Sequence, residues 1–147
     1  MFPEEASNID TSLEFVRASK IEEMSRACNQ AIENGFDMEI RGKTKHFSLT
    51  IQDQMNLASL SSLLNSGALS VPYHADGETV RLYSSAEMQA IINKATSFKI
   101  YHTTYYNILK TYINTLNTID EIAAVVYGME LPKEYQNDIL NSWDIGV

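Results

Sequence analysis

Three side chains that could bind a metal or move protons lie in the short stretch HADGE, residues 74–78. His74, Asp76 and Glu78 alternate within it. A His-x-Asp pair with a later histidine, here His102, is the spacing of an iron site built from two histidines and one carboxylate. The same letters favour a turn, because Asp76-Gly77 lies between two apolar runs and glycine adopts the positive φ of a tight primed turn without steric cost. A reversal of the chain at this point would separate the ligands, so we expect no metal and no cofactor here.

Other residues with reactive side chains fit structural roles. The one cysteine, Cys28, falls in an apolar helical run and is expected to be buried, and a single cysteine excludes an internal disulfide framework. His102 lies among tyrosines in KIYHTTYYN, but at a position on a helical seam, where one polar residue commonly fixes the register. No glycine-rich nucleotide-binding motif and no nucleophile elbow occurs. We therefore expect no catalytic residues.

Local signals divide the first half of the chain into a helix, a hairpin and a second helix. Residues 1–9 are expected to be a loose leader. Apolar spacing predicts an amphipathic helix from residue 10 or 11 to residue 34, with Gly35 as its C-terminal cap. FDMEI, the turn RGKTK and HFSL then indicate a hairpin. Thr50 followed by Asp53 predicts the start of the next helix, which ends at NSGALS.

The second half repeats the order of hairpin and capped helix. VPYHADGETVRLY predicts a hairpin, and Ser84 with Glu87 forms a reciprocal capping box for a helix over residues 85–117. Thr118 and Glu121 indicate a short helix that ends at Gly128, and Pro132 begins a last helix that runs through Trp143. These elements predict an α+β fold: helix, β-hairpin, helix, β-hairpin, long coiled-coil-like helix and two short C-terminal helices. A single domain would cover residues 10–147, with the short helices in residues 118–144.

The long helix carries an apolar seam with alternating steps of three and four. Its members are Met88, Ile91, Ala95, Phe98, His102, Tyr105, Leu109, Tyr112 and Leu116. This spacing is typical of a coiled coil. The predicted first helix is shorter than the seam, so the remaining turns are expected to meet another copy or another protein. The sequence therefore predicts a protein interface formed by His102, Tyr105, Leu109, Tyr112 and Leu116, and a possible homo-oligomer through the long helix.

Composition limits the classes of partner. Eleven basic against nineteen acidic residues give a formal net charge of −8, which disfavours nucleic acid because the basic residues are not gathered on one face. Arg41, Lys43 and Lys45 form the densest basic cluster, and at a hairpin tip lysines more often protect an edge than bind phosphate. No apolar run approaches the length of a membrane span. We expect a soluble protein made in a cytosol, with no nucleic-acid or membrane partner.

Several short signatures resemble a known family. NGFDMEI, HFSLTIQDQMNL, YHADGETVRLYSSAEMQAI and YHTTYYNILKTYI, over roughly residues 12–117, resemble a domain of unknown function found in tail-tip, baseplate and tail-fibre proteins of tailed bacteriophages and prophages. The resemblance rests on Gly35, Phe36, Phe47, Thr50, Asp53, Gln54, Asn56, Asp76, Gly77, Lys99 and His102. The second hairpin departs from the commoner tryptophan-containing form of that family. The family has no assigned catalytic residues, so the resemblance implies a location and not a reaction.

These observations together predict a non-enzymatic structural or assembly protein of a phage tail. Its partners would be other tail proteins, and it would reside in the virion after synthesis in the bacterial host cytoplasm. The eight tyrosines and five phenylalanines suit protein contacts, although most are expected in the core. An alternative is a small acidic phage inhibitor of a host nucleic-acid enzyme, and a further alternative is a metal-dependent enzyme that uses His74, Asp76 and His102.

Overall fold

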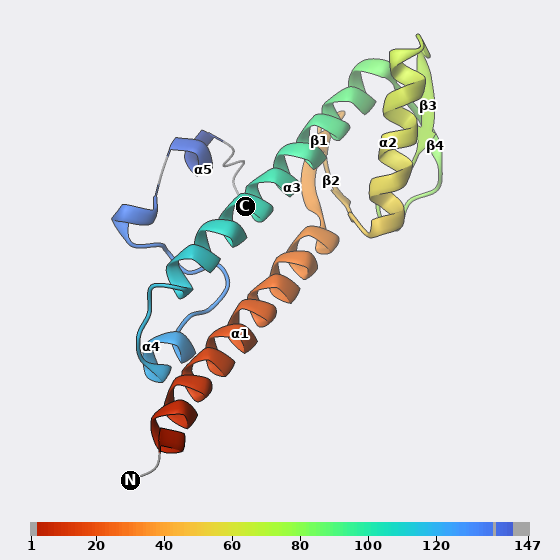
Figure 1. The fold of residues 1–147 in the computed structure, drawn as a ribbon. Helices are drawn as coiled ribbons and strands as arrows, with labels where there is room; N and C mark the ends of the chain where they lie inside the picture. Colours follow the sequence, from red (N-terminus) through yellow and green to blue (C-terminus); the bar gives the residue numbers. More distant parts are fainter. Residues whose placement is uncertain (1–2, 137, 143–147) are drawn as a thin grey trace. The chain divides into compact units, whose positions relative to one another are not determined.

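The computed structural model describes residues 3–136 and 138–142 as two compact units (Figure 1). The hairpin unit contains residues 30–102, and the helical unit contains the described residues up to 29 together with those from Thr103 to Ser142. Each two-stranded sheet is antiparallel, and helices account for most of the remainder, which confirms the α+β class. The expectation of a single domain over residues 10–147 stays a prediction.

The first helix, α1, spans Pro3–Asn34 and begins earlier than the sequence indicated. The expectation of a loose leader over residues 1–9 stays a prediction, and the helical backbone begins at Pro3. Proline is well tolerated in the first turn of a helix, where its missing N–H would be unpaired in any case.

Gly35 caps the C-terminal end of α1, as predicted, and directly precedes the first strand. Its φ is +81°, and its N–H donates to the carbonyl of Ile32 at 3.0 Å. A Cβ at this position would lie 1.9 Å from the carbonyl oxygen of Phe47. Glycine is thus required here twice, for the left-handed cap and for the close approach of the returning strand.

The first hairpin contains β1 (Phe36–Ile40) and β2 (Lys43–Phe47), with Phe36 opposite Phe47. Only Arg41 and Gly42 connect the strands, and their φ angles are +53° and +80°. Two successive positive values define the type I′ turn, whose twist matches that of the flanking strands. The turn is therefore shorter than the predicted RGKTK, because Lys43, Thr44 and Lys45 already belong to β2.

The second hairpin contains β3 (Ser70–Tyr73) and β4 (Arg81–Ser84), joined by residues 74–80. The predicted turn is confirmed: Gly77 has a φ of +75°, and the N–H of Glu78 donates to the carbonyl of Ala75 at 3.2 Å. The predicted primed form was wrong, because Arg41 is the one non-glycine residue with positive φ in the described chain. Asp76 therefore has negative φ, and positive φ at the second central residue alone is the pattern of a type II turn.

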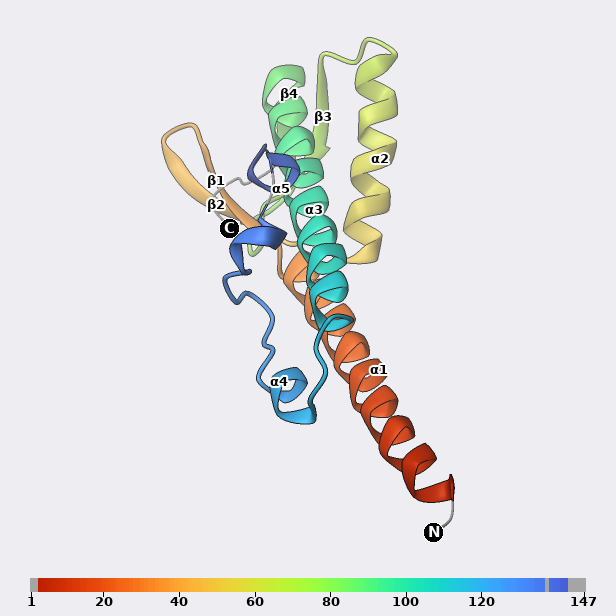
Figure 2. The same cartoon turned by 60° about the vertical axis from the view of Figure 1, so that its left-hand side comes forward.

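Two helices of the hairpin unit begin at the predicted residues, and each begins with a capping box. In α2 (Ile51–Asn65), the Thr50 hydroxyl accepts from the N–H of Asp53 at 3.1 Å, and the Asp53 carboxylate accepts from the N–H of Thr50 at 3.0 Å. In α3 (Ser85–Ile113), Ser84 and Glu87 exchange the same pair of bonds at 3.0 and 3.1 Å. Figures 1 and 2 both show α2 beside the second hairpin.

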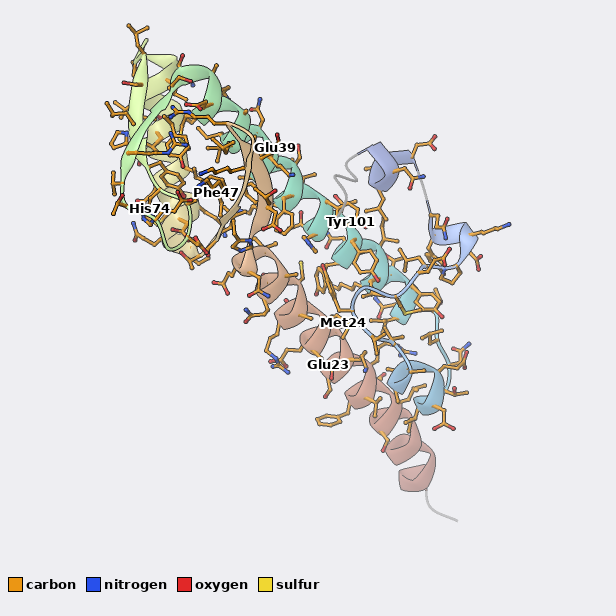
Figure 3. The ribbon with its side chains drawn as sticks, turned by 180° about the vertical axis from the view of Figure 1, so that it is seen from behind. Glu23, Met24, Glu39, Phe47, His74 and Tyr101 are labelled. Carbon is orange, nitrogen blue, oxygen red and sulfur yellow. The ribbon has the colours of Figure 1, made fainter. Side chains whose placement is uncertain are left out.

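Aromatic rings form the core of the hairpin unit. The Phe47 ring is 2% exposed and contacts the rings of Phe36, Tyr73 and Tyr83 at centroid distances of 5.8, 6.1 and 6.5 Å (Figure 3). Phe36 also contacts Phe98 of α3 at 5.7 Å. The first strand pair, the second strand pair and α3 therefore share one apolar cluster, which fixes the elements that surround the candidate site.

The helical unit departs from the prediction at its helix ends. The long helix was expected over residues 85–117, but α3 ends at Ile113, and the N–H of Leu116 donates to the Ile113 carbonyl at 3.1 Å in a tight turn. Thr118 caps α4 (Ile119–Ala123), which ends before the predicted Gly128. The last predicted helix is divided into a 3₁₀ turn (Lys133–Tyr135) and α5 (Asp138–Ser142) by extended backbone at Gln136, and Trp143 lies outside the described residues.

Within residues 3–136 and 138–142, no helix combines the length and the apolar character that crossing a membrane requires.

Candidate functional site

The three residues of the hypothetical iron site have separate surroundings. His74 lies in the loop of the second hairpin (Figure 3), where its Nδ1 is 3.0 Å from the carbonyl oxygen of Ala75. The Asp76 carboxylate accepts hydrogen bonds from the backbone N–H of Ser48, at 3.1 Å, and from the Ser48 hydroxyl. In the described part of the chain no three His, Cys, Asp or Glu side chains form a group that could hold a metal ion.

His102 is buried among aromatic rings of the hairpin unit. It is 8% exposed, and the rings of Phe98 and Tyr101 meet it edge-on at centroid distances of 4.7 and 5.6 Å. Burial lowers the pKa of His102 because the charged imidazolium loses its hydration. A buried imidazole on the seam is consistent with the structural role that the sequence indicated.

The other residues of the predicted interface are covered by their own chain within the helical unit. The Tyr105 hydroxyl donates to the carbonyl of Met129 at 2.6 Å, and its ring meets the Tyr127 ring at a centroid distance of 5.1 Å. Leu109 is fully buried, Leu116 is buried, and half-buried Tyr112 contacts the Tyr135 ring at 5.3 Å. The segment after α3 therefore supplies cover that the sequence interpretation assigned to another chain, although an interface through these residues stays a prediction.

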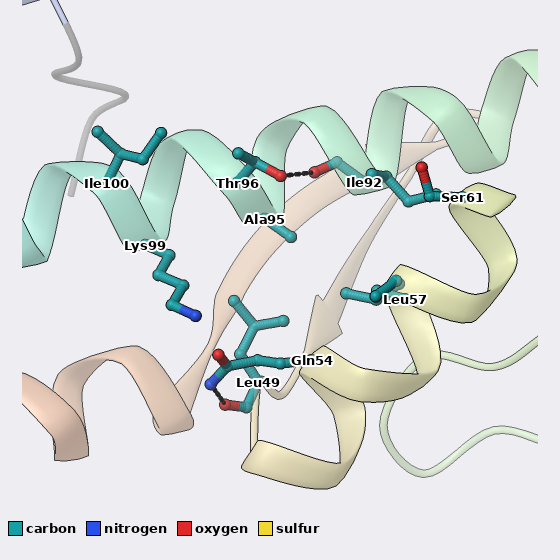
Figure 4. Close-up of a pocket in the computed structure, with 10 residues that line it drawn as sticks. Leu49, Gln54, Leu57, Ser61, Ile92, Ala95, Thr96, Lys99 and Ile100 are labelled. Atoms are coloured by element: carbon teal, nitrogen blue, oxygen red, sulfur yellow. Dashed lines mark hydrogen bonds between the residues drawn. The ribbon is translucent and has the colours of Figure 1, made fainter. Parts of the chain in front are cut away.

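A groove between α2 and α3 is the candidate binding site of the hairpin unit (Figure 4). Its volume is about 310 Å³. Leucine, isoleucine and alanine side chains form most of its walls, with three polar residues and one charged residue among them. The lining residues are Leu49, Gln54, Leu57, Ala58, Ser61, Ile92, Ala95, Thr96, Lys99 and Ile100.

Small side chains line the groove on both helices, and two of its polar groups bond within the chain. Ala58 of α2 and Ala95 of α3 both line the groove and leave space that larger side chains would fill. The Gln54 amide donates to the Leu49 carbonyl at 3.0 Å, and the Thr96 hydroxyl donates to the Ile92 carbonyl at 2.9 Å (Figure 4). Binding to the groove would therefore depend mainly on its apolar walls.

The outer face of α2 continues this apolar character into solvent. Ile51 and Met55 are 64% and 60% exposed, and Leu63 is half exposed. Leu57 is the buried residue of this helix, and Asp53 is its one charged residue. An exposed helix normally carries charged residues on its solvent side, so the outer face of α2, defined by Ile51, Met55 and Leu63, is typical of a surface that meets another molecule.

The sequence interpretation missed this site, although one signal was present. IQDQMNLASLSSLLN contains a single charged residue in a helix of fifteen. The predicted coiled-coil seam drew attention to α3, where apolar residues are more numerous. The low charge of α2 was the observation that distinguished an open apolar face from a covered one.

A polar cluster joins the first hairpin to the end of α1. The His46 ring places Nδ1 2.7 Å from an Asp37 carboxylate oxygen and Nε2 2.5 Å from the Asn34 carbonyl oxygen. Both partners are acceptors, so this geometry favours the ring form that carries a proton on both nitrogens. The bond to Asp37 is the main reason that the pKa of His46 is raised. A histidine that donates from both nitrogens does not serve as a general base.

Arg41 and Lys45 of the basic cluster pair with acidic side chains, and Cys28 is buried. Arg41 forms a two-point ion pair with Glu87, at 2.7 and 2.9 Å, and Lys45 pairs with Glu78 at 2.8 Å. The bonds from Arg41, and then from Ser84, lower the pKa of Glu87 to about 2. Cys28 is buried in the helical unit, as expected, and burial raises the pKa of its thiol, which disfavours the reactive thiolate.

Comparison with known families identifies the family of this chain. The sequence profile of the family described as domain of unknown function (DUF4376) matches residues 15–127. The chain belongs to this family. The match confirms the resemblance to a domain of unknown function, and it includes every element from most of α1 to α4, with both hairpins and the groove. No curated protein and no solved structure matches the chain.

Proposed function

We propose that this protein is a non-enzymatic structural or assembly protein that contacts other proteins through its hairpin unit. The observation that carries the proposal is the outer face of α2, which exposes Ile51, Met55 and Leu63 beside an apolar groove. Exposed apolar surface costs free energy in water, and a partner that covers it recovers roughly 25 cal/mol for each Å² buried. An uncharged helix face beside an apolar groove is therefore suited to protein contact.

The roles of the ionisable side chains support a non-enzymatic function. His46 donates from both ring nitrogens, Asp76 accepts from Ser48, and Asp53 closes a helix cap. Each of these groups is engaged in a bond that holds one element to another. A general acid or base must instead reach a substrate within hydrogen-bond distance.

We assign the partners to a bacteriophage tail on the strength of the sequence resemblance described above. The proposal is a tail-tip, baseplate or fibre-associated protein, made in the bacterial host cytoplasm and carried in the virion. Tail assemblies are built from protein contacts, and an apolar face of this kind would serve either as a lasting contact or as one used during assembly.

Labelling of purified phage particles with an antibody to this protein tests the location. Signal at the tail tip or baseplate is the expected result, and particles from a phage deleted for the gene are the control. A chain that is abundant in infected cells and absent both from particles and from tail assembly intermediates would overturn the proposal.

A second candidate is an acidic inhibitor of a host nucleic-acid enzyme, which the net charge of −8 favours. A mimic of nucleic acid needs carboxylates ranked along one surface. Here Glu87 and Glu78 are neutralised by Arg41 and Lys45, and Asp76 is engaged by Ser48. These pairings favour the structural role over the inhibitor.

A further inference from the structure

A second cavity, the hairpin pocket, lies between α2 and the second hairpin. Its lining residues are Asp53, Asn56, Ser59, Leu60, Pro72, Tyr73, His74 and Val80. All of them belong to the hairpin unit, and none of them lines the groove between α2 and α3. The volume of the hairpin pocket is about 370 Å³, near the lower end of the roughly 300–1,000 Å³ that is usual for ligand sites. The pocket is therefore large enough to receive one long side chain.

Asp53 gives the hairpin pocket a negative charge that no cation of the described chain neutralises. It is the one acidic residue of the lining, and neither lysine nor arginine lines the pocket. The N–H and the hydroxyl of Thr50 donate to Asp53 Oδ2 at 3.0 and 2.8 Å, which holds the carboxylate in the cap of α2. Among residues 3–136 and 138–142, no side chain forms an ion pair with Asp53. Its Oδ1 atom is therefore available to a donor from another molecule.

Tyr73 adds an aromatic wall whose surroundings are electrically negative. Its half-buried ring stacks on the Phe47 ring at a centroid distance of 6.1 Å, which holds it in place. The pKa of Tyr73 is raised to about 12, first by burial and then by the negative charges of Asp53 and Asp76. Negative charges that disfavour a phenolate favour a cation at the same position. A cation with a flat face suits such a site best, because it can pair with a carboxylate and also lie against an aromatic ring.

We propose that the hairpin pocket binds an arginine side chain of a partner protein, with the guanidinium group at Asp53 and against the ring of Tyr73. The assignment rests on the proposed function and deepens it by naming the side chain that the partner supplies. The guanidinium would donate to Oδ1 of Asp53 while Oδ2 keeps its bonds in the cap. The methylene stem would lie along Leu60, Pro72 and Val80, the aliphatic part of the lining. Lysine suits the pocket less well, because its ammonium group is more strongly hydrated and has no flat face.

The hairpin pocket borders the outer face of α2. Met55, Ser59 and Leu63 follow each other at steps of four, which places them on one side of the helix. Met55 and Leu63 belong to the exposed outer face, and Ser59 lines the pocket. A partner that covers the outer face therefore lies next to the pocket. The outer face contributes apolar area, and the pocket selects the sign of the charge that the partner brings.

A second copy of the chain has no free arginine to offer. All four arginines of the chain already have partners: Arg17 donates to the carbonyl of Leu116, Arg26 pairs with Glu22, Arg41 pairs with Glu87, and Arg81 lies over the ring of Tyr83. Arg81 is opposite Tyr73 in the strand pair, but its guanidinium carbon is 3.8 Å from the centre of the Tyr83 ring, and it does not line the pocket. The occupant that the pocket favours is therefore a segment of a different protein.

Selection from a library of displayed peptides tests the proposal on the full-length protein. The library would present random peptides of about twelve residues, so no residue type and no backbone conformation is imposed. We expect the wild-type protein to enrich arginine beside apolar residues. The selected peptides would then be made with citrulline in place of arginine, which keeps the shape of the side chain and removes its charge. This replacement should weaken binding by roughly tenfold, because a charge-assisted hydrogen bond becomes a neutral one.

A matched pair of lysine substitutions separates binding in the pocket from a general effect of charge. Val80→Lys places an ammonium group at the pocket from a side chain that is 63% exposed, so it should keep the fold, compete for Asp53 and reduce peptide binding by roughly tenfold or more. Val126→Lys makes the same change at a valine of the helical unit that is 59% exposed, and it should leave binding unchanged.

Asp53→Asn removes the charge of the pocket directly. The amide oxygen of asparagine can still accept the bonds that cap α2, so the helix should keep its start while peptide binding falls by roughly tenfold. Circular dichroism and urea unfolding of each variant confirm that folding is intact. If Asp53→Asn does not fold, the comparison of Val80→Lys with Val126→Lys decides the question alone.

Four outcomes would overturn the assignment. The first is a selection that enriches no peptide or enriches peptides without a preference for arginine. The second is equal binding of the arginine and citrulline peptides, and the third is equal binding to Val80→Lys and Val126→Lys. The fourth is a wild-type dimer by light scattering that becomes monomeric in Val80→Lys alone, which would make a second copy the occupant.

Particle labelling is independent of these four outcomes. Tail labelling without a preference for arginine would reject the assignment of the pocket and retain the proposed function. A preference for arginine that depends on Val80 and Asp53, in a protein absent from particles and assembly intermediates, would retain the pocket and reject the proposed location.

Discussion

The seam of α3 and the outer face of α2 are both apolar, but the chain covers only the first. Leu109 and Tyr105 of the seam are buried by residues of the helical unit, whereas Ile51 and Met55 of α2 remain more than half exposed. Apolar periodicity predicts which side of a helix avoids water, but it does not identify what covers that side. The low charge of α2 is the additional signal that separates an open face from a buried one.

The largest effect on stability is expected from a substitution at Leu109, in the covered seam of α3. Leu109→Ala should lower the free energy of unfolding by roughly 2–5 kcal/mol, because the side chain is fully buried and its removal leaves a cavity. Lys110→Ala, at an exposed neighbouring position, should change it by less than about 0.5 kcal/mol. Urea unfolding measures both, and similar small losses would show that the seam is not covered as described.

A smaller loss is expected at the buried residue of α2. Leu57→Ala should cost about 2 kcal/mol, at the low end for a buried leucine, because Leu57 already borders the open groove and loses fewer contacts. The comparison with Leu109→Ala in the same urea experiment sharpens the difference between the two regions. A cost at Leu57 that equals or exceeds the cost at Leu109 would contradict the open groove.

The two buried or paired histidines should give opposite dependences on pH. Burial lowers the pKa of His102. The stability that His102 contributes is therefore complete above the ordinary pKa of 6.5 and is lost as pH falls below that value. The bonds to Asp37 and Asn34 raise the pKa of His46, so its contribution is complete below 6.5 and is lost as pH rises through the raised value. Asp76 is the further carboxylate that raises this pKa.

Urea midpoints at pH 5, 6.5 and 8 measure this prediction. His46→Ala should remove the part of the stability loss between pH 6.5 and pH 8 that comes from His46. His102→Gln should remove the part of the stability loss between pH 6.5 and pH 5 that comes from His102. Wild-type stability that changes in the same way in both variants would show that neither histidine has the assigned environment.

The smallest effect on stability is expected on the outer face of α2. Ile51→Gln combined with Met55→Gln should change the free energy of unfolding by less than about 0.5 kcal/mol, because both side chains are exposed. The same double variant should lose binding to partner proteins in cross-linking of tail assemblies. Thermal unfolding and cross-linking together check this, and a large loss of stability would place these residues in the core.

The sequence predicted the elements whose signals are local. The hydroxyl and carboxylate of a capping box bond within four residues of each other, so Thr50 with Asp53 and Ser84 with Glu87 were recognisable without knowledge of the fold. Gly35 was recognisable as a helix cap for the same reason. The order of helices and hairpins followed from these markers.

Features set by distant contacts were predicted less well. Asp76-Gly77 has the local signal of a primed turn, but the Asp76 carboxylate bonds to Ser48 and its N–H donates to the His46 carbonyl at 2.9 Å, so the first hairpin determines the loop's conformation. Arg41-Gly42, a less typical pair, forms the primed turn instead. The exposure of α2 depends on which neighbours reach it, and the low charge of the helix was its one local sign.

The different loops of the two hairpins have a consequence for the order of folding. The first hairpin closes through two residues, and hairpins with such short connections form in roughly 1–10 μs. The second holds its loop through Ser48 and Asp76, which are 28 residues apart, so this contact requires closure of a longer segment. We therefore expect the first hairpin to be structured in the transition state, with the loop of the second hairpin consolidating on it afterwards.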